Sequence, residues 1–227
     1  LQIIRIMRLT IIHPCIGRHA GDRNYVRTWQ MEPLPAATLA GLTPRDIEIR
    51  FYDDRMEDIP FDEATDLVAI SVETYTARRA YQISSSYRER GVPVVMGGFH
   101  PSLCPDEVAG HAEAVVVGEA EESWPRLLDD FRHGTLQKFY RSSGRPSLER
   151  MQPDRSIFHN KRYLNVGLVE AGRGCHFKCD FCAVQTVFNS SQTRRPVDLI
   201  LAELMAIKDT RKLIFFVDDN ITSNLAQ

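Results

Sequence analysis

The sequence is poor in cysteine, has no long apolar run and carries almost no net charge. Its 5 cysteines among 227 residues are an odd number, and no signal peptide opens the chain, so a disulfide-stabilised secreted protein is disfavoured. No stretch is apolar over the length of a transmembrane helix. The net charge of -2 gives no electrostatic basis for nucleic acid as a partner. These absences predict a protein of the reducing cytoplasm without a membrane span.

What remains is the composition of an ordinary globular protein, 43% hydrophobic and 26% charged, long enough for one or two domains. Both ends are unusual. The chain opens with Leu1, and Met7 begins a better-formed stretch, so we expect residues 1–6 to lie upstream of the natural start. At the other end, Asn224 to Gln227 stop just after a strand-like run, which predicts a fragment cut inside its second domain.

Apolar runs alternate with helical patterns over residues 8–135, which predicts a parallel sheet with helices on its faces. Several runs are almost continuously apolar, as expected of strands buried on both sides. Helical spacing predicts one helix over 77–90 and another that ends at Gly134. The five predicted strands are Leu9–His13, Ile47–Tyr52, Leu67–Val72, Val92–Met96 and Ala114–Val117. The fold class is therefore α/β, a flavodoxin-like doubly wound parallel sheet whose ligand sits at the carboxyl ends of the strands.

A different pattern follows this first domain, which we place at residues 7–137. Glycine and proline among polar residues mark 138–162 as a linker. Residues 163–227 then form a second unit of strand, loop, helix and strand, which is one βαβ unit. Its elements are a strand Val166–Glu170, a helix from near Pro196 and a strand Leu213–Val217.

Cys175, Cys179 and Cys182 lie within eight residues at the carboxyl end of the first strand of this unit. Three thiolates at this spacing can ligate three irons of a cubane cluster and leave the fourth iron open. Electron carriers usually close such a site with a fourth cysteine, so an open iron suggests that a substrate or cofactor binds there. A structural zinc site needs four ligands, and beyond His176 the sequence offers no second pair downstream. The sequence favours a 4Fe–4S cluster.

The cysteine loop, VEAGRGCHFKCDFC over 169–182, resembles the signature of the radical S-adenosylmethionine (SAM) superfamily. Three further stretches resemble the class of radical SAM enzymes that contains a cobalamin-binding domain. They are GGFHPSLCPDEV (97–108), AEAVVVGEAEESW (112–124) and FFVDDNITSN (215–224). The resemblance covers most of the chain. It implies that the second unit is the start of a radical SAM (β/α) barrel, incomplete here because such barrels need about 200 residues or more.

The resemblance, together with the position of several motifs at strand ends, assigns cofactor-binding candidates in the first domain. Gly97 and Gly98 let the backbone approach a large planar ligand, although a tight turn with positive φ would also require glycine. His100 faces the ligand or serves as a turn residue before proline. The other candidates are Ser71, Thr74, Gly118 and Glu119. Ser71 and Thr74 have the alternative role of capping the next helix, Gly118 repeats the glycine pattern after the fifth strand, and Glu119 has the alternative role of complementing the dipole of the following helix.

In the second unit the resemblance implies a set of metal ligands and a SAM site. The metal ligands are Cys175, Cys179 and Cys182. SAM would bind the open iron, with Phe181 near its adenine, while Gly172 and Gly174 keep the loop compact. Asp218 and Asp219 would receive the SAM ammonium or ribose hydroxyls, or else form a solvated strand end.

The resemblance implies reductive cleavage of SAM to a 5′-deoxyadenosyl radical, which removes hydrogen from an unactivated carbon. With cobalamin the outcome is methyl transfer, and we favour a cobalamin-dependent methyltransferase with a small-molecule substrate. The electron donor would be a flavodoxin or a ferredoxin. The sequence identifies no catalytic side chain, and this chain alone is not expected to turn over, because further barrel strands would supply much of the substrate pocket.

Three alternatives stay open. One is an oxidative ring-forming cyclase of the same class, and another is a non-catalytic redox or cobalamin-sensing module. The third, a methylthiotransferase, needs a second cluster on three cysteines, whereas the first domain offers only Cys15 and Cys104.

The loop after the first predicted strand departs from the motif of cobalamin proteins that use a histidine ligand. Proteins that place a histidine below the metal show Asp-x-His-x-x-Gly after the first strand, and residues 13–21 read HPCIGRHAG instead. His13 and His19 are therefore weak ligand candidates, and we expect no protein histidine on cobalt.

Overall fold

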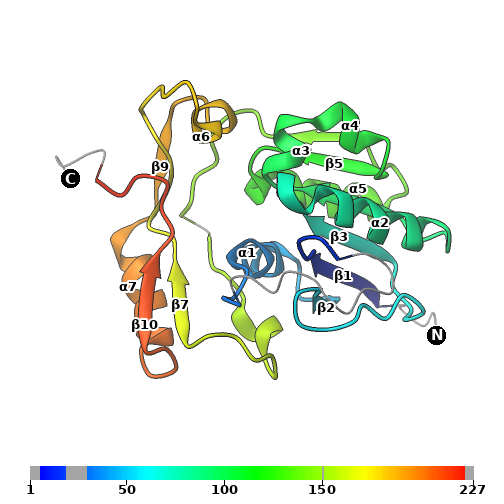
Figure 1. Ribbon diagram of the computed structural model, residues 1–227, viewed down its shortest axis with the longest axis horizontal. Coiled ribbons are helices and arrows are strands. Elements are labelled where there is room, and N and C mark those ends of the chain that lie inside the picture. The colour runs from blue at the N-terminus through cyan, green and yellow to red at the C-terminus, as the bar shows by residue number, and fades with distance from the viewer. Residues whose placement is uncertain (1–5, 19–29, 150, 223–227) are drawn as a thin grey trace.

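The structure, a computed structural model, describes residues 6–18, 30–149 and 151–222. His19 lies outside the described residues. Two groups of strands face each other, with helix α1 (Leu34–Leu42) between them (Figure 1).

The larger group is a six-stranded sheet in which every neighbouring pair is parallel. Its spatial order is β2-β1-β3-β4-β5-β6, a flavodoxin-like order with one strand added beyond β5. The order in which successive strands are added to the sheet therefore reverses at β1: β2 lies on one side of it, and β3 to β6 lie on the other. The strands are β1 (Met7–His13), β2 (Ile47–Asp53), β3 (Leu67–Ser71), β4 (Val94–Gly97), β5 (Ala114–Val117) and β6 (Phe139–Arg141). The five predicted strands are confirmed to within two residues at each end, and β6 was not predicted.

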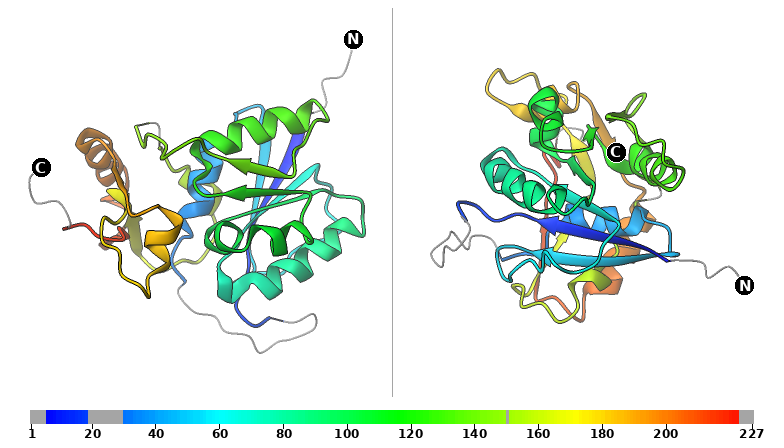
Figure 2. Two further views of the ribbon diagram at one scale, coloured as in Figure 1. Left: turned by 90° about the horizontal axis from the view of Figure 1, so that it is seen from above. Right: turned by 90° about the vertical axis from the view of Figure 1, so that its right-hand side faces the viewer.

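Helices cover both faces of this sheet, so each face has its own apolar core (Figure 2). On one face α1 and α5 (Ala120–Arg132) pack over Leu9 and Val116, and Trp124 of α5 lies in the same core. Trp124 Nε1 donates to Thr43 Oγ1 at 2.9 Å, which ties α5 to the end of α1. On the other face the main helix is α2 (Ala77–Arg88), preceded by the 3₁₀ turn η1 (Thr74–Thr76). The short helices α3 (Phe99–Leu103) and α4 (Pro105–Ala109) follow β4.

The segment predicted as a linker, 138–162, belongs largely to the first domain, which corrects that prediction. Its first residues form β6, and its later part forms a 3₁₀ turn, η2 (Arg155–Phe158). Phe158 is buried in the core beneath α1, with its ring centroid 5.4 Å from that of Phe51. The fit against α1 is tight, because a Cβ on Gly41 would lie 2.0 Å from the carbonyl oxygen of Gln152. The segment covers α1.

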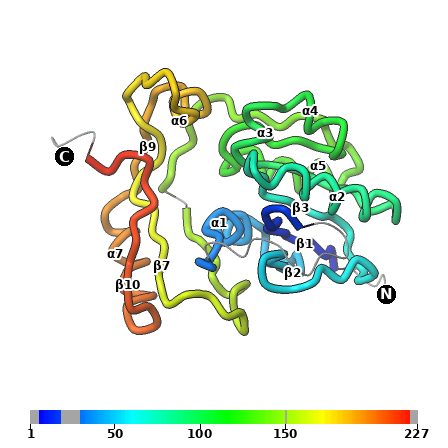
Figure 3. Tube along the Cα trace, in the orientation of Figure 1, coloured from blue at the N-terminus to red at the C-terminus, as the bar shows by residue number. Residues whose placement is uncertain are grey.

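The second group of strands contains the predicted βαβ unit. β7 (Val166–Val169) pairs in parallel with β10 (Leu213–Phe216), and α7 (Val197–Ile207) connects them (Figure 3). An antiparallel pair that the sequence did not predict, β8 (Gly172–Gly174) and β9 (Gln192–Arg194), lies within the connection. It encloses the cysteine loop and the short helix α6 (Ala183–Val187). Across the described ranges, no helix has the length and apolar character needed to cross a membrane.

Candidate functional site

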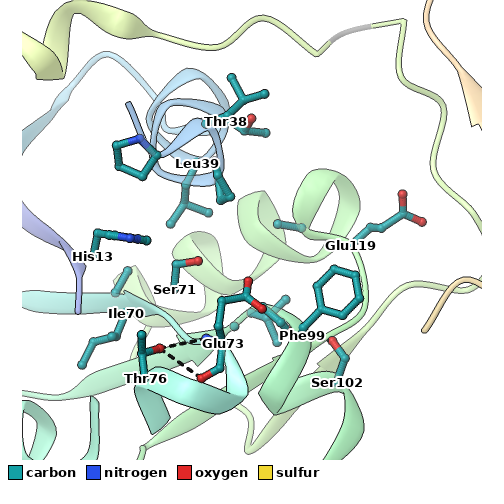
Figure 4. A pocket seen from close by; sticks show the side chains of 18 of the residues that line it. His13, Thr38, Leu39, Ile70, Ser71, Glu73, Thr76, Phe99, Ser102 and Glu119 are labelled. Carbon is teal, nitrogen blue, oxygen red and sulfur yellow. Dashed lines mark hydrogen bonds between the residues drawn. The ribbon is translucent and has the colours of Figure 1, made fainter. Parts of the chain in front are cut away.

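A cavity of about 770 Å³ lies where the carboxyl ends of β1, β3, β4 and β5 meet the second unit. The sheet supplies one wall and α1 another, and β7, β8 and α6 contribute residues from the second unit. This is the edge at which an open parallel sheet binds its ligand, and it includes the β1/β3 reversal point. Figure 4 shows side chains from several of these elements around the space.

Two glycines at the end of β4, Gly97 and Gly98, line the cavity without side chains. Gly98 has φ +115°, and a Cβ there would lie 2.7 Å from the carbonyl oxygen of Val72. That carbonyl also accepts from the backbone N–H of His100, so the two strand ends are in close contact. Gly97 lies against Val116, because a Cβ on Gly97 would lie 3.3 Å from the Cβ of Val116. Glycine is therefore required at position 98 for backbone reasons, and no side chain projects into the cavity there.

Polar side chains line the cavity beside the β1/β3 reversal point. His13 and Ser71 end their strands, and Glu73 follows β3 (Figure 4). Burial, helped by the positive charge of Arg55, lowers the pKa of His13 to about 4, so the imidazole is neutral at physiological pH. Its Nδ1 is buried and has no hydrogen-bond partner among the described residues. Burial raises the pKa of Glu73 to about 7. Sequence reasoning missed Glu73, because no motif contains it.

A buried ion-pair cluster closes the cavity next to the second unit. Glu119, at the start of α5, binds Arg145 from the predicted linker and Arg173 from β8. Arg173 also pairs with Glu121 at 2.8 Å and with Glu170 at 2.8 Å. Although burial opposes the charged form, these carboxylates raise the pKa of Arg173, so it stays protonated. The cluster fixes the second unit against the end of β5.

The predicted first-domain residues divide into two sets. Those that line the cavity are Ser71, Gly97, Gly98, Gly118 and Glu119. Thr74 and His100 do not line it, and their assignment as ligand contacts stays a prediction. Thr74 begins η1 and is exposed. His100 is buried under α2, where its Nε2 lies 2.9 Å from the hydroxyl of Tyr81.

The predicted residues of the second unit are arranged around the cysteine loop. Asp219 lines the cavity and accepts the backbone N–H of Gly174 at 2.7 Å, while Asp218 accepts that of Ala171 at 2.8 Å. Gly174 has φ +89°, and a Cβ there would lie 2.2 Å from the carbonyl oxygen of Ser191. Gly172 is similarly constrained, because a Cβ on Gly172 would lie 2.9 Å from the carbonyl oxygen of Thr193.

The three loop cysteines are accessible rather than packed in a core. Cys179 is exposed, and Cys175 and Cys182 are partly exposed. Asn220 Nδ2 lies 3.4 Å from Cys175 Sγ. Among the described residues no three histidine, cysteine or acidic side chains come together as a metal site, so the thiols are not gathered here. Phe181 is 92% exposed, away from the cavity.

Comparisons with known proteins agree with this geometry. Residues 31–128 match the B12 binding domain family. The chain is 33% identical over 201 residues to the bacteriochlorophyllide d C-12(1)-methyltransferase of Chlorobaculum tepidum, covering 84% of this chain and 44% of that protein. It is 37% identical over 169 residues to the C-8(2)-methyltransferase of the same organism, covering 71% and 37%. The chain thus spans less than half the length of these relatives.

A solved structure has the same fold over nearly the whole chain. It is the radical SAM methyltransferase TsrM from Kitasatospora setae, with cobalamin and a [4Fe-4S] cluster bound. The TM-score is 0.67 at 14% identity, and the match covers 95% of this chain and 49% of that one.

The parallel sheet, its carboxyl-end cavity and the family match define an α/β protein with a B12 binding domain. Residues 31–128 therefore match a B12 binding domain, and over most of its length the chain is similar to the methyltransferases named above.

The residues present fit both cofactors that are bound in the TsrM structure. For cobalamin, the cavity offers the backbone of Gly97 and Gly98, which has no side chain, and the buried Nδ1 of His13, which has no hydrogen-bond partner among the described residues. For the cluster, three thiols on one accessible loop supply the donor chemistry that iron–sulfur clusters require.

Proposed function

We propose that this chain is part of a radical SAM methyltransferase that uses cobalamin to methylate an unactivated carbon. The observation that carries the proposal is the shared cavity, which lies between the B12 binding domain and the unit that contains the three cysteines. When bound, the cluster and SAM supply a 5′-deoxyadenosyl radical, and the corrinoid supplies the methyl group. The names of the two Chlorobaculum tepidum relatives support methyl transfer as the reaction.

In this proposal the chain's own residues bind and orient the cofactors. Gly97 and Gly98 would lie against the corrinoid, and Asp219 would position the SAM amino acid or ribose at the opposite side. The cluster of Glu119, Arg145 and Arg173 would hold the two cofactor-binding units at a fixed separation and keep water out between them. We place the domain boundary after η2, so that the first domain includes β6 and the segment that covers α1.

The metal ligands of the proposal are Cys175, Cys179 and Cys182. Anaerobic reconstitution of the chain with iron and sulfide should give the visible absorbance of a 4Fe–4S cluster. Replacing any one of the three by alanine should abolish most of it. Cys104→Ala is the matched control, because Cys104 is also partly exposed but lies in the first domain. Equal cluster content in all four variants would contradict the assignment.

The reaction itself is tested in the full-length protein. Incubation with SAM and a reductant should release 5′-deoxyadenosine and yield a product heavier by one methylene unit. A product that is lighter by hydrogen atoms and contains a new ring would instead indicate the cyclase. Release of no 5′-deoxyadenosine by a cluster-loaded protein would favour a non-catalytic module.

A further inference from the structure

Glu73 places a carboxyl group inside the cavity, just beyond the end of β3. Figure 4 shows its side chain extending into the space between His13 and Phe99. Its backbone is held by Thr76, whose Oγ1 accepts from the Glu73 N–H and donates to the Glu73 carbonyl, both at 3.0 Å. The turn therefore fixes the position from which this carboxyl projects.

The charged groups that face this carboxyl do not neutralise it. The titratable groups on the other cavity walls are His13, Glu32, Arg55, Tyr75, Glu119, Glu121, Glu170, Arg173 and Asp219. Arg55 donates to both carboxylate oxygens of Asp53, at 2.8 and 2.6 Å. Arg173 is bound to Glu119, Glu121 and Glu170. Burial is accordingly the cause of the raised pKa of Glu73.

A carboxylate in a largely apolar cavity destabilises the empty protein unless a partner satisfies it. Water can solvate this carboxylate while the cavity is empty, and a ligand that displaces the water must offer it a partner instead. Groups that complement a carboxylate are N–H donors and positive charge. A corrinoid has a rim of carboxamide side chains, which offer N–H donors around a planar ring. Glu73 lies at the β1/β3 reversal point, where this fold places its ligand.

We propose that Glu73, as a carboxylate, accepts hydrogen bonds from carboxamide N–H groups of the bound corrinoid, and that it makes corrinoid binding pH-dependent. Glu73 is thus a positioning residue for the cofactor. The inference rests on the proposed cobalamin function and deepens it.

The direction of the pH dependence follows from the protonation of the empty cavity. With a pKa of about 7, Glu73 is protonated at pH 6 and ionised at pH 8 when the cavity is empty. Binding that requires the carboxylate must then release a proton, so affinity rises with pH and is about tenfold weaker at pH 6 than at pH 8. His13 does not contribute over this range, because its pKa is about 4.

The test measures the affinity of the 227-residue chain for methylcobalamin by equilibrium dialysis in the dark, at pH 6 and pH 8. Methylcobalamin is the suitable probe because neither of its axial ligands ionises over this range. Glu73→Gln keeps the shape of the side chain but cannot ionise, so its affinity should be the same at both pH values. Glu89→Gln, at the exposed end of α2, should keep the wild-type profile. In dilute buffer at pH 7, wild type should also release about half a proton per corrinoid bound, and Glu73→Gln none.

Two results would overturn the inference while leaving corrinoid binding intact. One is a wild-type affinity that is constant or falls with rising pH, and the other is a Glu73→Gln variant that keeps the tenfold difference. If folded wild type binds no methylcobalamin at either pH, the proposed function fails, and the role of Glu73 fails with it.

Discussion

Arg145 donates from Nε and Nη2 to the two carboxylate oxygens of Glu119, at 2.5 and 3.2 Å. Arg145 follows β6, whereas Glu119 begins α5. The same guanidinium donates to the Ser191 carbonyl at 2.9 Å and to Thr193 Oγ1 at 2.8 Å, both near β9. This one side chain therefore joins the end of the first sheet to the unit that contains the cysteines.

Arg145→Ala should destabilise the chain by about 3 kcal/mol in urea unfolding followed by circular dichroism. The value is at the lower end for breaking a buried ion pair, because Arg173 still pairs with Glu119. Arg132→Ala is the matched control. Its pair with Asp46, at 2.7 Å, is exposed and should contribute less than about 1 kcal/mol. Equal losses in the two variants would contradict a joining role for Arg145.

Gly98→Ala should lower the free energy of unfolding by about 3 kcal/mol. The new Cβ would meet the Val72 carbonyl at 2.7 Å, on a backbone with φ +115°. Gly144→Ala, where nothing lies within 4 Å of the new Cβ and φ is not positive, should change stability by less than about 1 kcal/mol. A Gly98→Ala protein as stable as the Gly144→Ala protein would show that the contact between the two strand ends is wrong.

The stability of the ligand-free chain should depend on pH through the Glu73 carboxyl. Its pKa is higher in the folded state, about 7, than its ordinary value of 4.5, so the folded state binds more protons. Stability from this group is present at low pH and is lost as pH rises from about 4.5 through 7. Glu73→Gln should therefore match wild type at pH 4 and exceed it at pH 8, by about 3 kcal/mol at most. A gain that is equal at both pH values, measured by urea unfolding, would contradict burial of an ionisable group.

The first sheet was predictable because several of its strands, such as β3 (LVAIS) and β5 (AVVV), are apolar on both faces, whereas α1 and β6 were not predicted. Helix α1 lies between the sheet and the segment around Gln152, so both of its sides are covered and its sequence, LPAATLAGL, shows no polar stripe. Strand β6 has three residues, which are too few to show an alternating or apolar strand pattern. It forms because it pairs with β5. Both elements depend on contacts distant in sequence.

The candidate site could be predicted where it lies at strand ends, and not where it depends on how the two units meet. Gly97, Gly98 and Gly118 line the cavity because they directly follow buried strands. Arg173 and Phe188 enter it from the second unit, whose placement is set by long-range contacts such as that of Arg145. His100 looked like a ligand contact from its motif, yet the turn after Gly98 directs it to Tyr81.

The second unit leaves apolar side chains uncovered on β10 and α7. Leu213 is 65% exposed and Phe215 56% exposed on β10, and Leu201 and Met205 on α7 are exposed as well. Such a surface promotes association, so the 227-residue chain should self-associate in sedimentation velocity. Leu213→Lys should reduce this association, whereas Leu103→Lys on α3 should not. Equal effects of the two substitutions would show that the association does not involve β10.

Retention of a corrinoid tests the central claim most directly. The 227-residue chain is mixed anaerobically with hydroxocobalamin and desalted, and the corrinoid absorbance of the protein fraction is measured. A B12 binding domain with the cavity described here should retain about one corrinoid per chain. Complete loss of the colour from a chain that circular dichroism shows to be folded would contradict cobalamin as the ligand of this cavity.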